Sequence, residues 1–363
     1  MAAFNVPSAA AAATRLPARP SDRIMTDTQR RGIVPMGTRD YESQRLDFPI
    51  DRALIDELLA LWKVAFDLDL ADEIPQFLGR ELHANRDVLF LARRNDRVVA
   101  TCRLTQSRLD PRLGYLSEVA TAPDHRGHGL AGDLCRRAAD AFDDAGGHAC
   151  FLGADNQAAA RIYARLGWRR LPNTNVMLRV APPATPEEFL VDHVRRGLDR
   201  ELAIRPGGPE LRVPIIPAIV TPHDWIALDA NAAILSTRSV CQKSCVGLYP
   251  RYDRLRQPDG WFALVRDDQA VLGLASAARR DQDLWIVDAF THVHYSAWLQ
   301  PLYRRAADLA KRRHPAAVCA TCEQDDPLKA AALDRLGFRR TDRTIPLEHD
   351  PQILTLRLYE IPT

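Results

Sequence analysis

Residues 116–131 read LSEVATAPDHRGHGLA and determine how the surrounding chain is expected to fold. The apolar and β-branched residues up to Thr121 predict a strand, which Pro123 ends. The glycine-bearing segment 126–131 then turns directly into a helix. Glycines let the backbone approach a ligand closely, and the free N–H groups at a helix start face an anion. The stretch therefore predicts a pyrophosphate-binding loop, with an ordinary glycine-containing turn as the alternative.

The residues of this loop have different expected parts in binding the anion. Arg126 would supply a charge-assisted contact, and the small Ala131 leaves room for the phosphate. His128 is expected to contribute its backbone rather than its ring, so we assign it no catalytic role. The expected binding residues of the loop are Arg126, Gly127, His128, Gly129, Leu130 and Ala131.

The sequence on both sides of the loop predicts a mixed α/β sheet. Hydrophobic periodicity gives the order β-α-α-β-β-β-α-β-α-β up to residue 180, with a hairpin turn at Asn95 and Asp96. The expected strands are residues 44–50, 88–92, 98–104, 115–121, 150–152 and 176–180. The expected helices are residues 54–66, 77–82 and 157–166, together with a long helix from Leu130 that Gly146 closes.

The chain then repeats this pattern after a break. Three prolines begin a linker, residues 182–209, in which a charged helix is expected from Glu187 to about Ala203. The segment ARLGWRR at 164–170 matches DRLGFRR at 334–340. We therefore predict two tandem copies of one fold, at residues 44–181 and 210–363. The second copy is expected to contain strands at 211–220, 261–266, 271–277, 284–290, 317–321 and 353–359 and helices at 225–235, 297–312 and 327–336.

The composition limits the class of protein. Of the 363 residues, 46% are hydrophobic and 26% charged, which is typical of globular domains. A formal net charge of +2 lacks the basic excess of a nucleic-acid-binding protein. Because no apolar run approaches about 18 residues, no transmembrane helix is expected, and we expect a soluble, cytoplasmic protein. Residues 1–43 are rich in Ala, Pro and Arg and predict a disordered tail, with a transit peptide as the alternative.

The cysteines do not favour a metal site or a disulfide framework. Seven cysteines are scattered through apolar runs, which is typical of reduced core thiols. The pair Cys319 and Cys322 lies in an expected strand, where a separation of three residues places side chains on opposite faces. The pair Cys241 and Cys245 leaves zinc as the alternative. No metal is therefore expected.

A second motif follows the loop along the chain. Its residues are Asn156, Ala159, Tyr163, Gly167 and Trp168. In this order the two motifs resemble those of the GNAT superfamily of N-acetyltransferases, whose acyl-CoA loop reads Arg/Gln-x-x-Gly-x-Gly/Ala. The resemblance covers roughly residues 44–180. It implies that acetyl-CoA is the co-substrate and that an acetyl group is transferred to a primary amine of a small molecule or peptide.

The resemblance also implies roles for particular residues. In such enzymes the sheet opens beside the fourth strand, and the pantetheine arm pairs with the exposed strand backbone. The matching positions are Val119, Ala120 and Thr121. Asn156 matches an asparagine near the pantetheine; a helix N-cap is an alternative that does not exclude this role.

Acyl transfer also needs groups that move protons. Tyr163 resembles the tyrosine that protonates the leaving thiolate, with a packing tyrosine as the alternative. Glu118 is the candidate base, acting directly or through water, with a solvated strand carboxylate as the alternative. The loop between the first two expected helices could attract a cationic amine, with a solvated acidic loop as the alternative. Its acidic residues are Asp67, Asp69, Asp72 and Glu73.

The second copy lacks the residues of this chemistry. Residues 291–300 read THVHYSAWLQ and contain no glycine, while Leu333 replaces Tyr163 and Asp326 replaces Asn156. We therefore expect a degenerate copy that supports the first. His292 and His294 form a weak candidate metal pair, since no third ligand is near them.

Two other functions fit parts of the sequence. One is a non-catalytic acyl-CoA sensor or interaction scaffold. The other is aminoacyl transfer from tRNA, as in the Fem-like tandem relatives, which the intact loop and the near-zero charge disfavour. The amine acceptor, the acyl length and the oligomeric state do not follow from the sequence.

Overall fold

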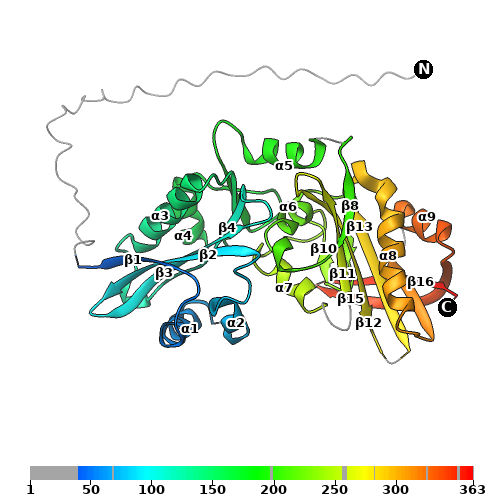
Figure 1. Cartoon of the computed structure of the whole chain (residues 1–363), viewed down its shortest axis with the longest axis horizontal. Coiled ribbons are helices and arrows are strands. Elements are labelled where there is room, and N and C mark those ends of the chain that lie inside the picture. The colour runs from blue at the N-terminus through cyan, green and yellow to red at the C-terminus, as the bar shows by residue number, and fades with distance from the viewer. Residues whose placement is uncertain are drawn as a thin grey trace, which may run out of the picture. The chain divides into compact units, whose positions relative to one another are not determined.

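The described residues build two seven-stranded sheets and one two-stranded sheet (Figure 1). The computed structural model describes residues 40–67, 69–196, 199–255, 260–281, 283–323, 326–349 and 352–362. Residues 1–39 of the tail expected at residues 1–43 lie outside the described residues. The end of the expected tail is wrong, because Glu42 and Ser43 already belong to a strand that pairs with residues 92 and 93. The mixed sheets between helices confirm the predicted α/β class.

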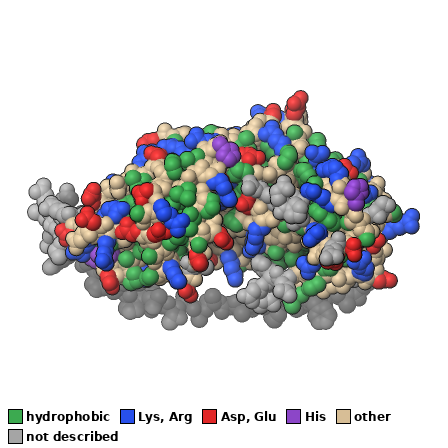
Figure 2. Space-filling model, turned by 60° about the horizontal axis from the view of Figure 1, so that its bottom comes forward, with side chains coloured by type: hydrophobic (Ala, Val, Ile, Leu, Met, Phe, Trp, Pro, Cys, Tyr) green, Lys and Arg blue, Asp and Glu red, His purple; other side chains and the backbone are tan. Residues whose placement is uncertain are grey.

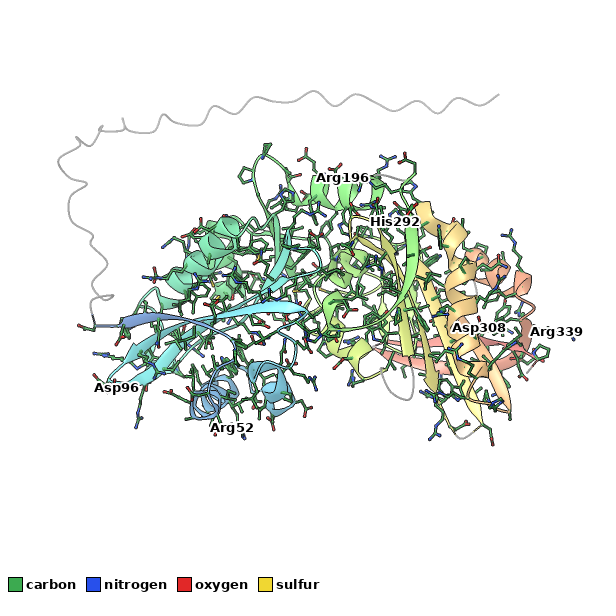
Figure 3. All side chains as sticks on the ribbon, viewed as in Figure 1. Arg52, Asp96, Arg196, His292, Asp308 and Arg339 are labelled. Atoms are coloured by element: carbon green, nitrogen blue, oxygen red, sulfur yellow. The ribbon has the colours of Figure 1, made fainter. Side chains whose placement is uncertain are left out.

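The first sheet has the strand order β1-β2-β3-β4-β5-β7-β6. Of its described strand pairs, only β4 and β5 run parallel. Asn95 and Asp96 have φ of 50° and 62°, which confirms the hairpin turn between β2 and β3. Figure 3 shows Asp96 at the tip of that hairpin. The strands are β1 (Glu42–Asp47), β2 (Asn85–Arg94), β3 (Arg97–Ser107), β4 (Leu113–Thr121), β5 (Ala149–Gly153), β6 (Arg169–Arg170) and β7 (Val176–Val180).

Helices cover both faces of the first sheet (Figure 1). Alternate residues of β2 point to opposite faces, so Leu89 packs with Trp62 of α1 whereas Phe90 packs with Leu134 of α3. The element order of residues 44–180 is confirmed except for the additional short strand β6, whereas the helix expected at residues 77–82 is wrong in position because the helix ends at Phe77 and turns follow. The helices on one face are α1 (Arg52–Phe66) and α2 (Ile74–Phe77), and those on the other are α3 (Leu130–Asp144) and α4 (Gln157–Arg165).

The second sheet has the order β8-β11-β12-β13-β14-β16-β15. Its described parallel pair, β13 with β14, occupies the same place in this order as β4 with β5 in the first sheet. The strands are β8 (Leu202–Pro206), β11 (Gly260–Arg266), β12 (Val271–Arg279), β13 (Leu284–Thr291), β14 (Ala317–Cys322), β15 (Arg339–His349) and β16 (Gln352–Ile361). Helices α8 (Leu299–Lys311) and α9 (Pro327–Arg335) lie beside this sheet (Figure 1).

The prediction of a strand at residues 211–220 is wrong. This segment forms α6 (Ile215–Val220), after a short 3₁₀ turn, η4 (Pro209–Leu211). A fully buried apolar run has no periodicity that separates strand from helix. Pro214 and Pro217 also lack the N–H groups that a central strand donates.

The neighbouring elements differ as well. The helix expected from Glu187 to about Ala203 is α5 (Pro186–Arg195) followed by β8, and the helix expected at 225–235 is replaced by two short strands. These are β9 (Ala227–Asp229) and β10 (Ile234–Leu235), and an unforeseen helix, α7 (Leu248–Asp253), follows them. Because β9 and β10 together contain five residues, they are too short to show a periodic pattern.

Helix α5 contacts both halves of the chain. Phe189 packs against β5 of the first half. At the C-terminal end of α5, the carbonyl oxygens of His193 and Val194 accept hydrogen bonds from Arg266 (2.9 Å) and from the Tyr295 hydroxyl (2.8 Å) of the second half. These donors satisfy carbonyl groups that a helix end leaves unpaired.

Charges of both signs are mixed on the surface. Figure 2 shows Lys and Arg side chains interspersed with Asp and Glu over one face, in keeping with the net charge of +2. None of the helices in the described part of the chain has both the length and the apolar character needed to span a membrane.

Candidate active site

Strands β4 and β5 separate part of the way along the first sheet. Their parallel pairing ends at Leu116 opposite Leu152, whereas β4 continues for five more residues. On its other edge β4 stays paired with β3, where Thr101 lies opposite Ala120. The backbone edge of Val119 to Thr121 that faces β5 therefore has no strand partner among the described residues. This is the edge at which the predicted pantetheine-binding residues lie.

The loop before α3 leaves its backbone open to solvent. Gly127 and Gly129 have φ of 82° and 78°, which glycine adopts without strain, and a Cβ at either would meet no atom within 4 Å. Gly129 is the N-cap of α3 and has no side-chain capping hydrogen bond. The first N–H groups of this 15-residue helix therefore remain available to an anion.

The side chains around this loop leave the helix start uncovered. Arg126 is exposed and donates from Nε to the carbonyl oxygen of Thr121 (3.2 Å). His128 is exposed, with Nδ1 3.2 Å from the carbonyl oxygen of His125. Leu130 turns its side chain into the core, so only its backbone faces the loop. Ala131 is half-buried.

Tyr163 lies on α4 and is 5% exposed. It packs in the apolar cluster that contains Cys102 of β3 and Cys135 of α3. Burial raises the pKa of its hydroxyl, so the group keeps its proton at neutral pH. Packing and proton donation therefore remain compatible at this position.

Glu118 occupies an irregular place in β4. It has φ of 43°, and the register between β3 and β4 shifts at this point, which marks a β-bulge. Its carboxylate is 9% exposed and accepts a hydrogen bond from the Ser117 hydroxyl at 2.5 Å. Burial raises the pKa of Glu118, and Arg103, at 3.7 Å, partly opposes this shift. The alternative of a solvated carboxylate is thus wrong.

A buried ion pair that the sequence pattern does not predict lies beside Glu118. Arg103 donates from Nε (3.0 Å) and Nη2 (2.8 Å) to Oδ1 of Asp87, and its guanidinium lies 5.1 Å from the ring centroids of both Phe48 and Phe77. The Thr105 hydroxyl donates to the same Asp87 oxygen. Polar residues at alternate positions of an otherwise apolar strand were the available signal.

A hydrogen-bond chain fixes the bulge to α1. The indole N–H of Trp62 donates to the Thr101 hydroxyl (2.9 Å), which donates to the carbonyl oxygen of Glu118 (2.6 Å). Because Trp62 and Thr101 are buried, this chain orients the Glu118 backbone from the core.

The remaining predicted residues lie at the edges of the site. Asn156 is the N-cap of α4 and its side chain accepts from the Ala158 N–H (2.7 Å), so the capping interpretation is confirmed. In the acidic loop, Asp67, Asp69 and Asp72 are exposed, whereas Glu73 is half-buried.

The corresponding opening in the second sheet is filled by the chain itself. Pairing of β13 with β14 ends at Val287 opposite Ala320, yet the buried Lys329 donates to Asp288 (2.8 Å) beyond this point. The same ammonium donates to carbonyl oxygens of β9, at Ala227 (3.0 Å) and Leu228 (3.3 Å). The buried Leu333 stands where Tyr163 is expected by the repeat. Within the described residues, no group of three or more His, Cys, Asp or Glu side chains is arranged to hold a metal.

Comparison with known proteins assigns the first half to a family. Residues 52–168 match the acetyltransferase (GNAT) family. The chain therefore carries a GNAT acetyltransferase domain at these positions. No curated protein matches the chain.

Several solved structures are similar at low sequence identity. A GCN5-related N-acetyltransferase from Kribbella flavida is 16% identical, with 88% of this chain and 71% of that chain covered and a TM-score of 0.35. The putative acetyltransferase YncA from Salmonella typhimurium, solved with its cofactor acetyl-CoA, is 18% identical over 44% of this chain and 92% of that one, with a TM-score of 0.32. A GNAT family acetyltransferase from Brucella melitensis, in complex with acetyl-CoA, is 16% identical over 39% and 92%, with a TM-score of 0.29.

Proposed function

We propose that this chain is an N-acetyltransferase that moves an acetyl group from acetyl-CoA to a primary amine of a small molecule or peptide. The observation that carries the proposal is the unpaired edge of β4 next to an open glycine loop at the start of α3. In this proposal residues 44–181 are catalytic, and the segment expected as a linker, 182–209, connects them through α5 to β8, the edge strand of the second sheet. Residues 210–363 form the rest of a supporting second copy. No metal takes part.

The co-substrate would bind along the opening in the first sheet. The backbone of Val119 to Thr121 would pair with the amide groups of the pantetheine arm, as an added strand pairs with a sheet edge. The pyrophosphate would lie on the N–H groups at the start of α3, with Arg126 adding a charge-assisted contact. Asn156, besides capping α4, would lie near the pantetheine.

Two side chains would move the protons. Glu118 accepts a proton from the amine, directly or through water, and the free nitrogen then attacks the thioester carbonyl carbon. As the new C–N bond forms, the C–S bond breaks and Tyr163 gives its proton to the thiolate. The nitrogen then loses its second proton, which restores the Tyr163 hydroxyl directly or through water. The raised pKa of Glu118 supports its role as base, because it brings the carboxyl closer to neutral pH.

The second half would be a degenerate copy that holds no acyl-CoA. The shared strand order and the shared place of the parallel pair support a common fold. The buried ion pair of Lys329 and Asp288 supports this, because in this proposal it would lie in the space that a pantetheine would need.

A non-catalytic acyl-CoA sensor is the second candidate. The observation that favours it is the burial of Tyr163 in an apolar cluster, which a packing role alone explains.

Release of free CoA thiol separates the two candidates. Wild-type protein with acetyl-CoA is tested against a panel of amines and lysine-containing peptides, with free thiol as the readout. Turnover that depends on an added amine supports the enzyme. Acetyl-CoA binding in a calorimeter without turnover for any acceptor supports the sensor, and the absence of binding contradicts both.

A further inference from the structure

A cavity of about 170 Å³ lies at the end of β13 in the second half. Its lining comes from three parts of the chain: the segment before β9, the end of β13 with the start of η5 (Val293–Trp298), and α9. Figure 3 labels His292, which follows β13 and lines this cavity. Thr291 ends β13 as Thr121 ends β4, the strand after which the first half has its glycine loop.

The size and the walls of the cavity suit a single planar ring. An apolar cavity of about 150 Å³ is large enough to bind benzene, so this one holds a six-membered ring with small substituents. One wall is the indole of Trp225, which is 6% exposed and stacks on His223 with an interplanar angle of 15°. Val293 and Leu328 also line the cavity and are 47% and 40% exposed, so a bound ring would cover apolar surface at its mouth.

Two buried residues that line the cavity each have a polar atom without a hydrogen-bond partner. Thr291 is 1% exposed, and its hydroxyl has no partner within the described part of the chain. His223 is 7% exposed and donates from Nε2 to the carbonyl oxygen of Ala218 (2.7 Å). Its Nδ1 has no partner among the described residues. Because buried polar groups in proteins are normally hydrogen-bonded, these two atoms indicate a ligand.

The two imidazoles at the cavity offer opposite hydrogen-bonding groups. Burial lowers the pKa of His223 and of His292 to about 4, so both rings are neutral at pH 7 and carry one proton each. In His223 the proton is on Nε2, which leaves Nδ1 as an acceptor. In His292 it is Nδ1 that accepts, from the N–H of His294 (3.3 Å), so Nε2 carries the proton and is a donor. The two ring centroids are 6.3 Å apart, close enough for one small molecule to contact both.

The charges around the cavity favour an uncharged ligand. Among the described residues that line it, Asp224 alone is charged at neutral pH, and its side chain is 78% exposed and 3.9 Å from Arg238, which screens it. Lys329 lies 5.9 Å from the ring centroid of Trp225 but does not line the cavity, and nearby carboxyl groups hold its ammonium. The acidic residues around Lys329 are Asp288, Glu323 and Asp326.

We propose that the second half binds an uncharged six-membered heteroaromatic ring with an N–H group beside a C=O group, the edge that uracil presents. The ring lies against Trp225. Its N–H donates to Nδ1 of His223, its C=O accepts from Nε2 of His292, and the Thr291 hydroxyl donates to a second ring carbonyl. This site goes beyond the proposed acetyl transfer and does not depend on it.

Calorimetry with the full chain tests the ligand class. Uracil is compared with 1,3-dimethyluracil, in which methyl groups replace both N–H donors. We expect uracil to bind at least about 10-fold more tightly, because the methylated ring leaves Nδ1 of His223 without a partner. Equal affinity for the two compounds, or no binding of uracil up to about 10 mM, overturns the proposal.

A matched pair of threonine variants tests the position of the site. Thr291→Val should weaken uracil binding about 10-fold, and because the lost hydroxyl has no partner in the unbound protein, the melting temperature should not fall. Thr321 of β14 is also 1% exposed and also has an unpartnered hydroxyl, but it does not line the cavity. Thr321→Val should therefore leave uracil affinity unchanged. Unchanged affinity in Thr291→Val, or an equal loss in Thr321→Val, overturns the site.

Two further variants separate this site from the proposed acetyl-CoA site. Leu328→Trp fills the mouth of the cavity and should abolish uracil binding, whereas Ile353→Trp, at an exposed apolar residue of β16, should not. Gly129→Glu, in the glycine loop of the first half, should leave uracil affinity unchanged. Loss of uracil binding in Gly129→Glu would place uracil in the first half and overturn the proposal. Uracil binding as expected in a protein that releases no thiol with any amine would contradict acetyl transfer alone.

Discussion

At the scale of single residues, the site combines groups whose surroundings set their protonation. Tyr163 and Glu118 are both shielded from water, and burial raises the pKa of each. For Tyr163 this favours the neutral phenol, which is the form that can give a proton. For Glu118 it narrows the gap between the carboxyl pKa and neutral pH, which strengthens a carboxylate as a base.

Replacing Tyr163 by Phe tests its part as proton donor. Tyr163→Phe keeps the packing of the ring in the cluster with Cys102 and Cys135 and removes only the hydroxyl. If the hydroxyl protonates the thiolate, kcat should fall by roughly 10²-fold with acetyl-CoA affinity nearly unchanged. An unchanged kcat, measured where chemistry limits the rate, would leave Tyr163 a packing role alone.

The pH dependence of turnover tests Glu118. A base acts in its deprotonated form, so kcat should decline as the pH falls through the raised pKa of Glu118. Glu118→Gln should lower kcat by roughly 10²-fold and abolish this acidic limb. Asp47→Asn, at an exposed carboxylate of β1, is the control and should keep the limb. If the decline of kcat at low pH persists in Glu118→Gln, a group other than Glu118 causes it.

At the scale of elements, the conformation of the loop before α3 depends on two glycines. Their positive φ and the empty space around them keep the start of α3 open, as an anion site requires. This is a property of the loop and helix together, because neither Gly127 nor Gly129 offers a side chain to the ligand.

A matched pair of glycine variants tests this element. Gly129→Glu places a carboxylate where the pyrophosphate is expected and should abolish acyl-CoA binding. Gly146→Glu, at the opposite end of α3, has a similar φ of 76° and equally open space, so it should carry the same backbone strain without loss of binding. Calorimetry on both variants checks this. Undiminished binding in Gly129→Glu, or two equivalent sites in the wild type, would contradict the assignment.

How far the sequence predicts these elements depends on their periodicity. The first half was predictable in order because its strands alternate and its helices carry an apolar stripe, as in α3. The elements of residues 202–235 were not predictable. The apolar run that ends at Val220 is buried on all sides, and β9 and β10 are very short. The spacing of the loop glycines in the sequence predicts their role. The ion pair of Arg103 and Asp87 cannot be predicted in this way, because it depends on β2 and β3 lying side by side in the sheet.

At the scale of the whole chain from residue 40 on, the two halves share one core. The largest apolar cluster joins Tyr115 and Phe151 of the first sheet to Ile216 and Trp261 of the second half. The buried pair of Arg212 and Glu81 crosses the same boundary. Separation of the halves would expose this apolar surface and leave a buried charge without its partner.

Truncation tests this dependence. A fragment that ends after Val180 would lose α5 and the second half and expose Tyr115, Phe151 and Leu178. We expect it to be insoluble or weakly folded, as judged by its yield in the soluble fraction and by thermal unfolding. A soluble fragment with full acetyl-CoA affinity and turnover would show that the second half is dispensable.

Acid should destabilise the folded chain through two buried histidines. Burial lowers the pKa of His193 and of His223 to about 4, from about 6.5 in an unfolded chain. Below pH 6.5 the unfolded chain therefore binds protons that the folded chain excludes. The stability contributed by each neutral imidazole is complete above pH 6.5 and is lost as the pH falls toward 4, by up to about 3 kcal/mol per histidine.

The melting temperature between pH 7.5 and pH 5 measures this loss. His193 lies beside Arg266 between the two halves. His223 donates from Nε2 to the Ala218 carbonyl oxygen (2.7 Å) within the second half, so protonation of either histidine disturbs packing that the whole molecule shares. The double variant His193→Gln, His223→Gln should melt lower than wild type at pH 7.5 but lose less on acidification. If the melting temperatures of wild type and double variant fall equally with pH, other groups, such as the buried carboxylates, cause the loss of stability in acid.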